Sequence, residues 1–122
     1  MAWEIDNSRP IYIQLMDKIQ QDIVSGIYAP GDKLPSVRDL AVAAAVNPNT
    51  MQKALSELER LELVYTKRTS GRFITDDISL LTNMKTHLAQ EHIELFLTSM
   101  EQLGFAKDEA LELLHKYNKE NL

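Results

Sequence analysis

The stretch LPSVRDLAVAAAVNPNTMQKAL, residues 34–55, decides how this chain of 122 residues folds. Ser36, with Asp39 three residues later, is a capping-box-like start for one short helix. Asn47 followed by Pro48 is a typical start for a second helix, because asparagine caps well and proline fits the first turn. Apolar residues after each start recur at helical spacing. The stretch therefore predicts two short helices joined by a tight turn.

A further helix is expected ahead of this stretch, because apolar residues recur at helical spacing from Tyr12 to Ile23. Ser8 is the expected N-cap of this helix, and Gly26 suits its C-terminal end. Pro30, which is followed by glycine, then predicts a type II turn leading into residues 34–55. The first half of the chain is thus expected to hold three helices.

Two short runs rich in β-branched and aromatic residues follow, at residues 63–66 and 72–75. The segment between them, KRTSG at residues 67–71, ends in a glycine, which is typical of a hairpin turn. Three helices followed by a hairpin is the element order of a winged helix-turn-helix domain, in which the hairpin is the wing. We expect this domain to occupy residues 1–76.

Residues 77–122 are expected to form a helical dimerisation region. Their apolar residues recur at helical spacing from Ser79 to about Leu103, and a last helix is expected from Lys107 to about Lys119. Two such helices cannot bury their apolar surface alone, so we expect them to pack against a second copy of the chain. The residues expected at this dimer interface are Leu81, Met84, Leu88, His92, Leu95 and Phe96.

The predicted fold class is therefore mostly α with a small β-hairpin, a winged helix-turn-helix plus a two-helix C-terminal dimerisation tail. The formal net charge of −5 is unevenly distributed along it. Residues 1–75 carry nine Lys/Arg and nine Asp/Glu, whereas residues 76–122 carry four Lys/Arg and nine Asp/Glu. A neutral N-terminal region can still bind phosphates if its cations cluster on one face.

Several kinds of protein are disfavoured by what the sequence lacks. It has no cysteine, so neither a disulfide framework nor a thiolate metal site is available. No apolar run approaches the roughly 20 residues that span a bilayer. The start of the sequence does not resemble a signal peptide. We therefore expect a cytoplasmic protein without a membrane partner.

The segment from Asn47 to Lys53 suggests a DNA-reading function. Small polar residues at a helix N-terminus allow it to approach base edges in a major groove. Gln52 can pair with adenine, and cations near it and around Gly71 can reach phosphates. Arg38 is expected to clamp a phosphate or enter the groove. The residues expected to contact DNA are Arg38, Asn47, Asn49, Thr50, Gln52, Lys53, Lys67, Arg68, Ser70, Gly71 and Arg72.

Each of these patterns also has a plainer interpretation, as an ordinary helix start, a solvated arginine or a soluble charged hairpin. The histidines suggest a metal site only weakly, because His87 and His92 are five positions apart and suit shared ligation poorly. No glycine-rich phosphate loop or nucleophile motif is present. We therefore expect no metal, no cofactor and no enzymatic activity.

Taken together, the motifs resemble the GntR family of bacterial transcription regulators. The matching segments are residues 26–28, 30–41, 46–50, 54–59 and 70–74. The short helical tail, together with the opening PIYIQ that begins at Pro10, is similar to the YtrA-type subfamily, whose reduced C-terminal region serves mainly for dimerisation.

This resemblance implies a sequence-specific regulator that represses its own operon, acting as a homodimer on a double-stranded, pseudo-palindromic operator. It also implies DNA contacts from Arg38, from the start of the third helix and from the tip of the wing. One departure is Glu62, which stands where the family usually has glycine.

Two further possibilities remain open from the sequence. One is that the chain is a winged-helix protein-interaction module that does not bind DNA, which its acidic charge would suit. The other concerns regulation, since a small-molecule effector would find room in so short a tail only at the dimer interface around Leu88, His92 and Phe96.

Overall fold

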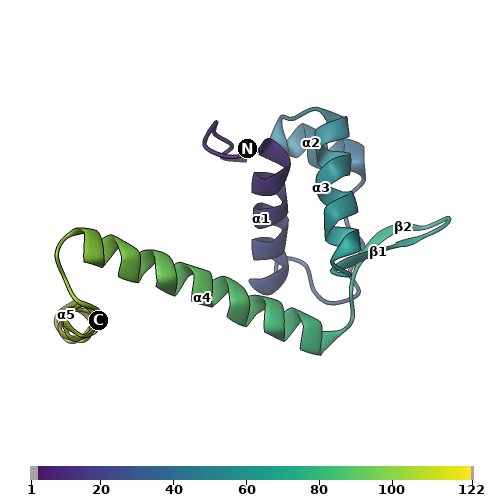
Figure 1. Ribbon diagram of the computed structural model, residues 1–122. Helices are drawn as coiled ribbons and strands as arrows, with labels where there is room; N and C mark the ends of the chain where they lie inside the picture. The colour runs from purple at the N-terminus through teal and green to yellow at the C-terminus, as the bar shows by residue number, and fades with distance from the viewer. Residues whose placement is uncertain (1–2, 122) are drawn as a thin grey trace. The chain divides into compact units, whose positions relative to one another are not determined.

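A computed structural model describes residues 3–121, which contain five helices and one antiparallel hairpin (Figure 1). Met1, Ala2 and Leu122, the ends of the two predicted domains, lie outside this range. The predicted mostly α fold with a small hairpin is confirmed. The elements are α1 (Ile11–Val24), α2 (Val37–Ala44), α3 (Pro48–Arg60), β1 (Val64–Lys67), β2 (Gly71–Ile74), α4 (Ile78–Gln102) and α5 (Lys107–Asn121).

The chain forms two compact units, the first ending at Met84 and the second beginning at Lys85. In the first unit α1 and α3 lie side by side, and α2 lies across the end of the pair where both helices begin (Figure 1). Their facing side chains and the base of the hairpin make one apolar core. Burying each large apolar side chain contributes about 1.5–3 kcal/mol. The largest fully buried side chains are Leu15, Ile19, Met51, Leu55, Leu58, Val64 and Ile74.

The two helix starts predicted within residues 34–55 are confirmed. The Ser36 hydroxyl accepts a hydrogen bond from the Asp39 backbone N–H at 3.1 Å. The Asn47 side-chain oxygen accepts one from the Asn49 backbone N–H at 2.7 Å. Each bond satisfies a backbone donor that the first turn of a helix leaves unpaired.

The turn between α2 and α3 is closed by Ala45, which adopts a left-handed conformation with φ of 58°. Glu62 does the same after α3, with φ of 65°. In both places the backbone N–H groups that follow bond back to carbonyls in the last turn of the helix. This geometry usually takes glycine, so both positions carry some backbone strain.

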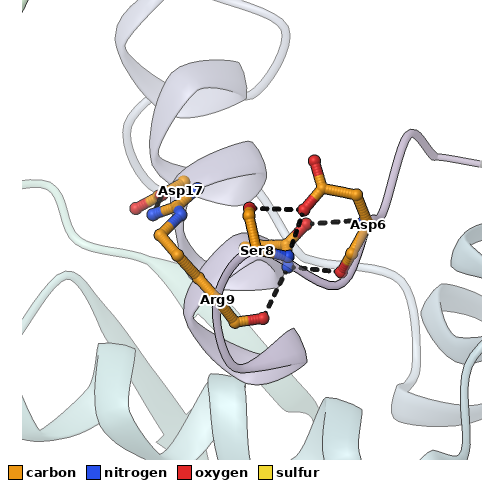
Figure 2. A network of polar contacts seen from close by, with 5 residues as sticks. Asp6, Ser8, Arg9 and Asp17 are labelled. Carbon is orange, nitrogen blue, oxygen red and sulfur yellow. Dashed lines mark hydrogen bonds and ion pairs between the residues drawn. The ribbon is translucent and has the colours of Figure 1, made fainter.

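The N-terminal segment before α1 is fastened by a buried glutamine. The Gln14 carboxamide accepts from the Asp6 backbone N–H at 3.0 Å and donates to the carbonyls of Asp6 and Arg9 at 2.9 and 2.8 Å. Figure 2 shows this segment, with Asp6 beside Ser8 and Arg9 beside Asp17. Hydrogen bonds from Ser8 lower the pKa of Asp6. The glutamine of the PIYIQ opening therefore has a structural role.

The expected N-cap of α1 was wrong. Pro10 occupies the cap position and has no capping side chain. The Ser8 hydroxyl instead donates to the Asp6 carboxylate, and its backbone N–H bonds the same group at 2.8 Å. The Asp6 carboxylate, two residues upstream, thus binds the Ser8 hydroxyl that was expected to cap α1.

The hairpin pairs Val64 with Ile74 and Thr66 with Arg72. Each strand lies one residue away from its predicted range, because the Leu63 N–H bonds the Leu58 carbonyl and so closes α3 before the strand begins. On the opposite face, Tyr65 and Phe73 stack with ring centroids 5.8 Å apart.

Lys33 extends this sheet. It forms an isolated antiparallel bridge with Phe73, and the neighbouring Leu34 N–H bonds the Arg72 carbonyl at 2.9 Å. The Asp32 N–H bonds the Ala29 carbonyl at 3.0 Å, and Gly31 has φ of 82°, which confirms the predicted type II turn. After this turn, Lys33 and Leu34 therefore lie along β2, at the edge of the wing, just before α2 begins.

The second unit differs from the first in how little it buries. Ala110 is fully buried there, but most large apolar side chains are exposed. No helix among the described residues is long and apolar enough to cross a membrane. The exposed large apolar residues of this unit are Ile93, Leu95, Leu103, Phe105, Leu111, Leu113, Leu114 and Tyr117.

Candidate nucleic-acid interface

The start of α3 presents polar side chains on the face turned away from the core. Asn49, Gln52 and Lys53 are exposed, whereas Thr50 is half-buried. Asn47 is exposed too, but its side-chain oxygen is occupied by the helix cap, so only its amide N–H groups remain available. The five predicted positions are therefore the N-cap of α3 and residues of its first two turns.

Two of these side chains are held by neighbours. The Gln52 amide nitrogen donates to the Ser56 hydroxyl at 3.1 Å, one turn further along α3. The Lys53 ammonium lies over the Tyr12 ring of α1, 4.0 Å from the ring centroid. A cation in this position is attracted by the electron-rich ring face. Both contacts restrict side chains that would otherwise sample many rotamers.

Arg38 lies in the first turn of α2 and is exposed. Its helix is fixed at this end by the Ser36 cap. The left-handed Ala45 then sets the direction of α3 relative to α2. The arginine is therefore carried by a rigid helix-turn-helix, as its predicted role requires.

The wing carries the remaining predicted residues. Arg68 and Ser70 are exposed in the turn between the strands, where the Ser70 N–H bonds the Lys67 carbonyl at 3.1 Å. The Lys67 ammonium lies 4.7 Å from the Phe73 ring centroid. Gly71 has φ of 109°, a conformation that favours glycine.

The cations of the N-terminal part of the chain fall into two groups. Residues 1–75 contain nine Lys/Arg, of which three form ion pairs: Arg9 with Asp17, Lys18 with Asp22 and Arg60 with Glu57. The other six have no ion pair within residues 3–121. These six are Lys33, Arg38, Lys53, Lys67, Arg68 and Arg72.

The unpaired cations are candidates for phosphate contacts. Five of the six unpaired cations are residues predicted to contact DNA. Lys33 is the sixth, and sequence reasoning missed it because its bridge to β2 joins residues far apart in the chain. The paired cations lie elsewhere, just before α1, on α1 and at the C-terminal end of α3.

The residues predicted at the dimer interface have unequal exposure. Leu81 and Met84 are partly buried against the core of the first unit. Leu88 and Phe96 are half-buried, and His92 and Leu95 are exposed. The strongest apolar exposure of α4 beyond Met84 therefore lies at Leu95 and near it.

A shallow groove of 520 Å³ lies in the second unit, between the end of α4 and the residues that lead into α5. Phe105 and Lys107 line it, together with Glu94 and Leu97. It does not include Leu88, His92 or Phe96, around which an effector was expected. Within the described range, no three histidines or carboxylates are grouped as a metal site would need.

Comparison with known proteins gives consistent matches. A family model described as bacterial regulatory proteins, gntR family, matches residues 11–74. The uncharacterized HTH-type transcriptional regulator YhcF of Bacillus subtilis strain 168 is 43% identical over 109 residues, 89% of this chain and 90% of that protein. The HTH-type transcriptional repressor YtrA of the same strain is 38% identical over 117 residues, 93% of this chain and 85% of that protein.

A solved structure agrees with these sequence matches. The GntR family transcriptional regulator from Listeria monocytogenes superposes with a TM-score of 0.83 at 39% identity, covering 92% of this chain and 98% of that one. The similarity includes the helices that follow the hairpin, because so little of either chain is left out.

Proposed function

The chain belongs to the GntR family of bacterial regulatory proteins, in its YtrA-type branch, as a helix-turn-helix transcriptional regulator and not an enzyme; we propose that it binds an operator sequence-specifically as a homodimer. The observation that carries this proposal is the location of the Lys and Arg residues that have no ion pair. Every Lys or Arg of residues 1–75 without an ion pair lies on α2, α3, the wing or the edge of the wing.

In the proposed complex α3 enters the major groove by its N-terminal turns. Gln52 and Asn49 then face base edges, where a carboxamide can pair with adenine. Thr50 and Asn47 contact sugar or phosphate near them, and Lys53 neutralises a phosphate. Arg38 reaches the same groove from the start of α2.

The wing binds the backbone beside this groove. Lys67, Arg68 and Arg72 supply positive charge, and Ser70 and Gly71 let the turn approach closely because their side chains are small. Contacts of this kind fix the register of the protein on DNA without reading the sequence.

Dimerisation through α4 and α5 brings a second winged helix-turn-helix to the same operator. The exposed apolar side chains of the second unit, including Leu95 and Leu114, would be covered by the other copy. Two identical winged helix-turn-helix domains related by a two-fold axis require a pseudo-palindromic operator.

We further propose that the chain represses its own operon, since the relative YtrA is a repressor by name. A bound dimer would block access to the promoter. A small-molecule effector would act through the second unit, at the dimer interface around His92.

Selection from a random duplex library tests this proposal. The wild-type protein should enrich an inverted repeat, and variants carrying Arg38→Ala and Gln52→Ala should lose the enriched sequence. Arg60→Ala is the matched control, because that arginine is ion-paired with Glu57 and should leave the selection unchanged. Absence of any duplex binding at low salt would overturn the proposal and favour a protein-interaction module.

A further inference from the structure

We propose that a groove between the wing and the start of α2 seats a single backbone phosphate, and that Lys33 is a phosphate-binding residue of this protein. The groove, called here the Lys33–Arg72 groove, has a volume of 760 Å³. This inference rests on the proposed DNA-binding function and names one point of contact within it.

The lining of the groove is suited to an anion. Lys33 and Arg72 contribute its two cations, and Ser36 and Ser70 contribute hydroxyl groups. The Thr66 hydroxyl also lines the groove but donates to the Glu59 carboxylate. Asp39 is its single carboxylate. Two positive charges against one negative charge leave a net positive site, which matches the single charge of a phosphodiester.

Neither cation is neutralised by a carboxylate within residues 3–121. The Nε atom of Arg72 is inaccessible and has no hydrogen-bond partner among the described residues. A buried donor without a partner costs free energy, so this nitrogen marks a polar group that the described residues leave unsatisfied. Its remaining N–H groups are available to an incoming anion.

One hydroxyl is already oriented. The Ser36 oxygen accepts the hydrogen bond that caps α2, so its proton is free to donate to another group. The first turn of α2 lines the groove through Val37 as well. Partial positive charge at this helix start adds to the attraction of an anion.

Gly71 makes the position of Lys33 possible. A Cβ atom built on Gly71 would come within 3.1 Å of the Lys33 Cε atom. Lys33 itself is fixed by its backbone bridge to Phe73. A side chain at position 71 would therefore require the lysine stem to shift slightly, in addition to straining the positive φ of this position.

The test measures binding to a short mixed-sequence duplex by fluorescence anisotropy over a series of chloride concentrations. Lys33→Met keeps the aliphatic stem and removes the charge. We expect binding about tenfold weaker, as for loss of one charge-assisted hydrogen bond. The slope of log K against log salt should fall by about 1 for each groove occupied.

Two controls accompany this variant. Arg60→Met also removes one positive charge but from an ion pair on α3, so it should leave affinity and slope unchanged. Asp39→Asn removes the carboxylate of the groove and should strengthen binding, the opposite direction from Lys33→Met. Both controls use the full chain.

The outcomes separate this inference from the proposed function. If the wild-type protein binds no duplex even at low salt, the proposed function fails. If the wild-type protein binds with a steep slope of log K against log salt, and Lys33→Met changes neither affinity nor slope, only the proposed phosphate site in the Lys33–Arg72 groove is overturned. If inorganic phosphate competes with the duplex beyond its ionic strength, and Lys33→Met abolishes that competition, free phosphate and the DNA backbone share this groove, as proposed. If Lys33→Met removes phosphate binding but leaves duplex affinity unchanged, the groove takes a free anion and the proposed DNA contact is overturned.

Discussion

The two units of this chain use their apolar and charged residues in opposite ways. The first, ending at Met84, buries most of its large apolar side chains in one core and leaves six cations without an ion pair among the described residues. The second, from Lys85, exposes most of its large apolar side chains, and residues 85–122 carry seven acidic and four basic residues. The first unit therefore has its own apolar core, whereas the second leaves most of its apolar surface uncovered.

In the proposed function, the two units have separate tasks, DNA binding in the first and dimerisation in the second. An unpaired cation is an available phosphate ligand, and an uncovered apolar side chain is an available dimer contact. The acidic second unit would also be repelled by DNA, which keeps it out of the groove.

The largest expected effect comes from leucines in the two units. Leu55 is fully buried and Leu95 is 65% exposed. Leu55→Ala should therefore lower the free energy of unfolding by about 2–5 kcal/mol, as a cavity in a packed core does. Leu95→Ala should leave the melting of the first unit unchanged and weaken self-association. Chemical denaturation measures the free energy of unfolding, and analytical ultracentrifugation measures self-association. Equal destabilisation by Leu55→Ala and Leu95→Ala would contradict the proposed difference between the two units.

Charge on the exposed apolar face should break the dimer. Leu95→Glu with Leu114→Glu places carboxylates where we expect two copies to meet, so the protein should sediment as a monomer. Lys116→Glu is the control for added negative charge on α5. Monomers that still bind the selected inverted repeat with wild-type affinity would show that the second unit does not pair the winged helix-turn-helix domains.

A smaller effect is expected at the two left-handed residues of the first unit. Ala45→Gly and Glu62→Gly should each stabilise the fold by about 0.5–1 kcal/mol, because relief of the strained φ exceeds the entropy cost of glycine in the unfolded chain. Ala43→Gly, within α2, should destabilise by about as much. Urea denaturation distinguishes these signs.

The smallest expected effect concerns the support of Lys53. Tyr12→Ala removes the ring beneath the ammonium and should weaken duplex binding by about 0.5–1 kcal/mol. Tyr12→Phe keeps the ring and should restore binding. A double-mutant cycle with Lys53→Met would give no coupling if the ring did not position the lysine.

Local chemistry explains how much of this fold was predictable. The caps at Ser36 and Asn47 and the turn at Gly31 depend on neighbours within three residues, so the sequence alone indicates them. The cap at Ser8 failed because Asp6 offered the same serine a competing partner. Alanine has no preference for positive φ, so the neighbouring sequence did not predict the left-handed conformation of Ala45.

The residues proposed for the DNA interface were chosen from local motifs in the same way, and such motifs do not reveal contacts between distant parts of the chain. Arg38 and Gln52 belong to motifs that can be recognised within a few residues. Lys33 lies beside Phe73 and Gly71 only after folding, so no spacing rule identifies it. The same holds for Tyr12 under Lys53, which joins α1 to α3.

The most direct test of the central claim compares two charge-matched double variants. Lys67→Met with Arg68→Met removes two unpaired cations of the wing, and Arg9→Met with Arg60→Met removes two cations that are ion-paired. Binding to the same duplex is measured across a salt series. The account predicts that the wing variant loses affinity and that its slope falls by about 2, while the paired-cation variant keeps both. Equal losses in the two variants would show that net charge alone governs binding, and would contradict the claim that unpaired cations form the DNA-binding face.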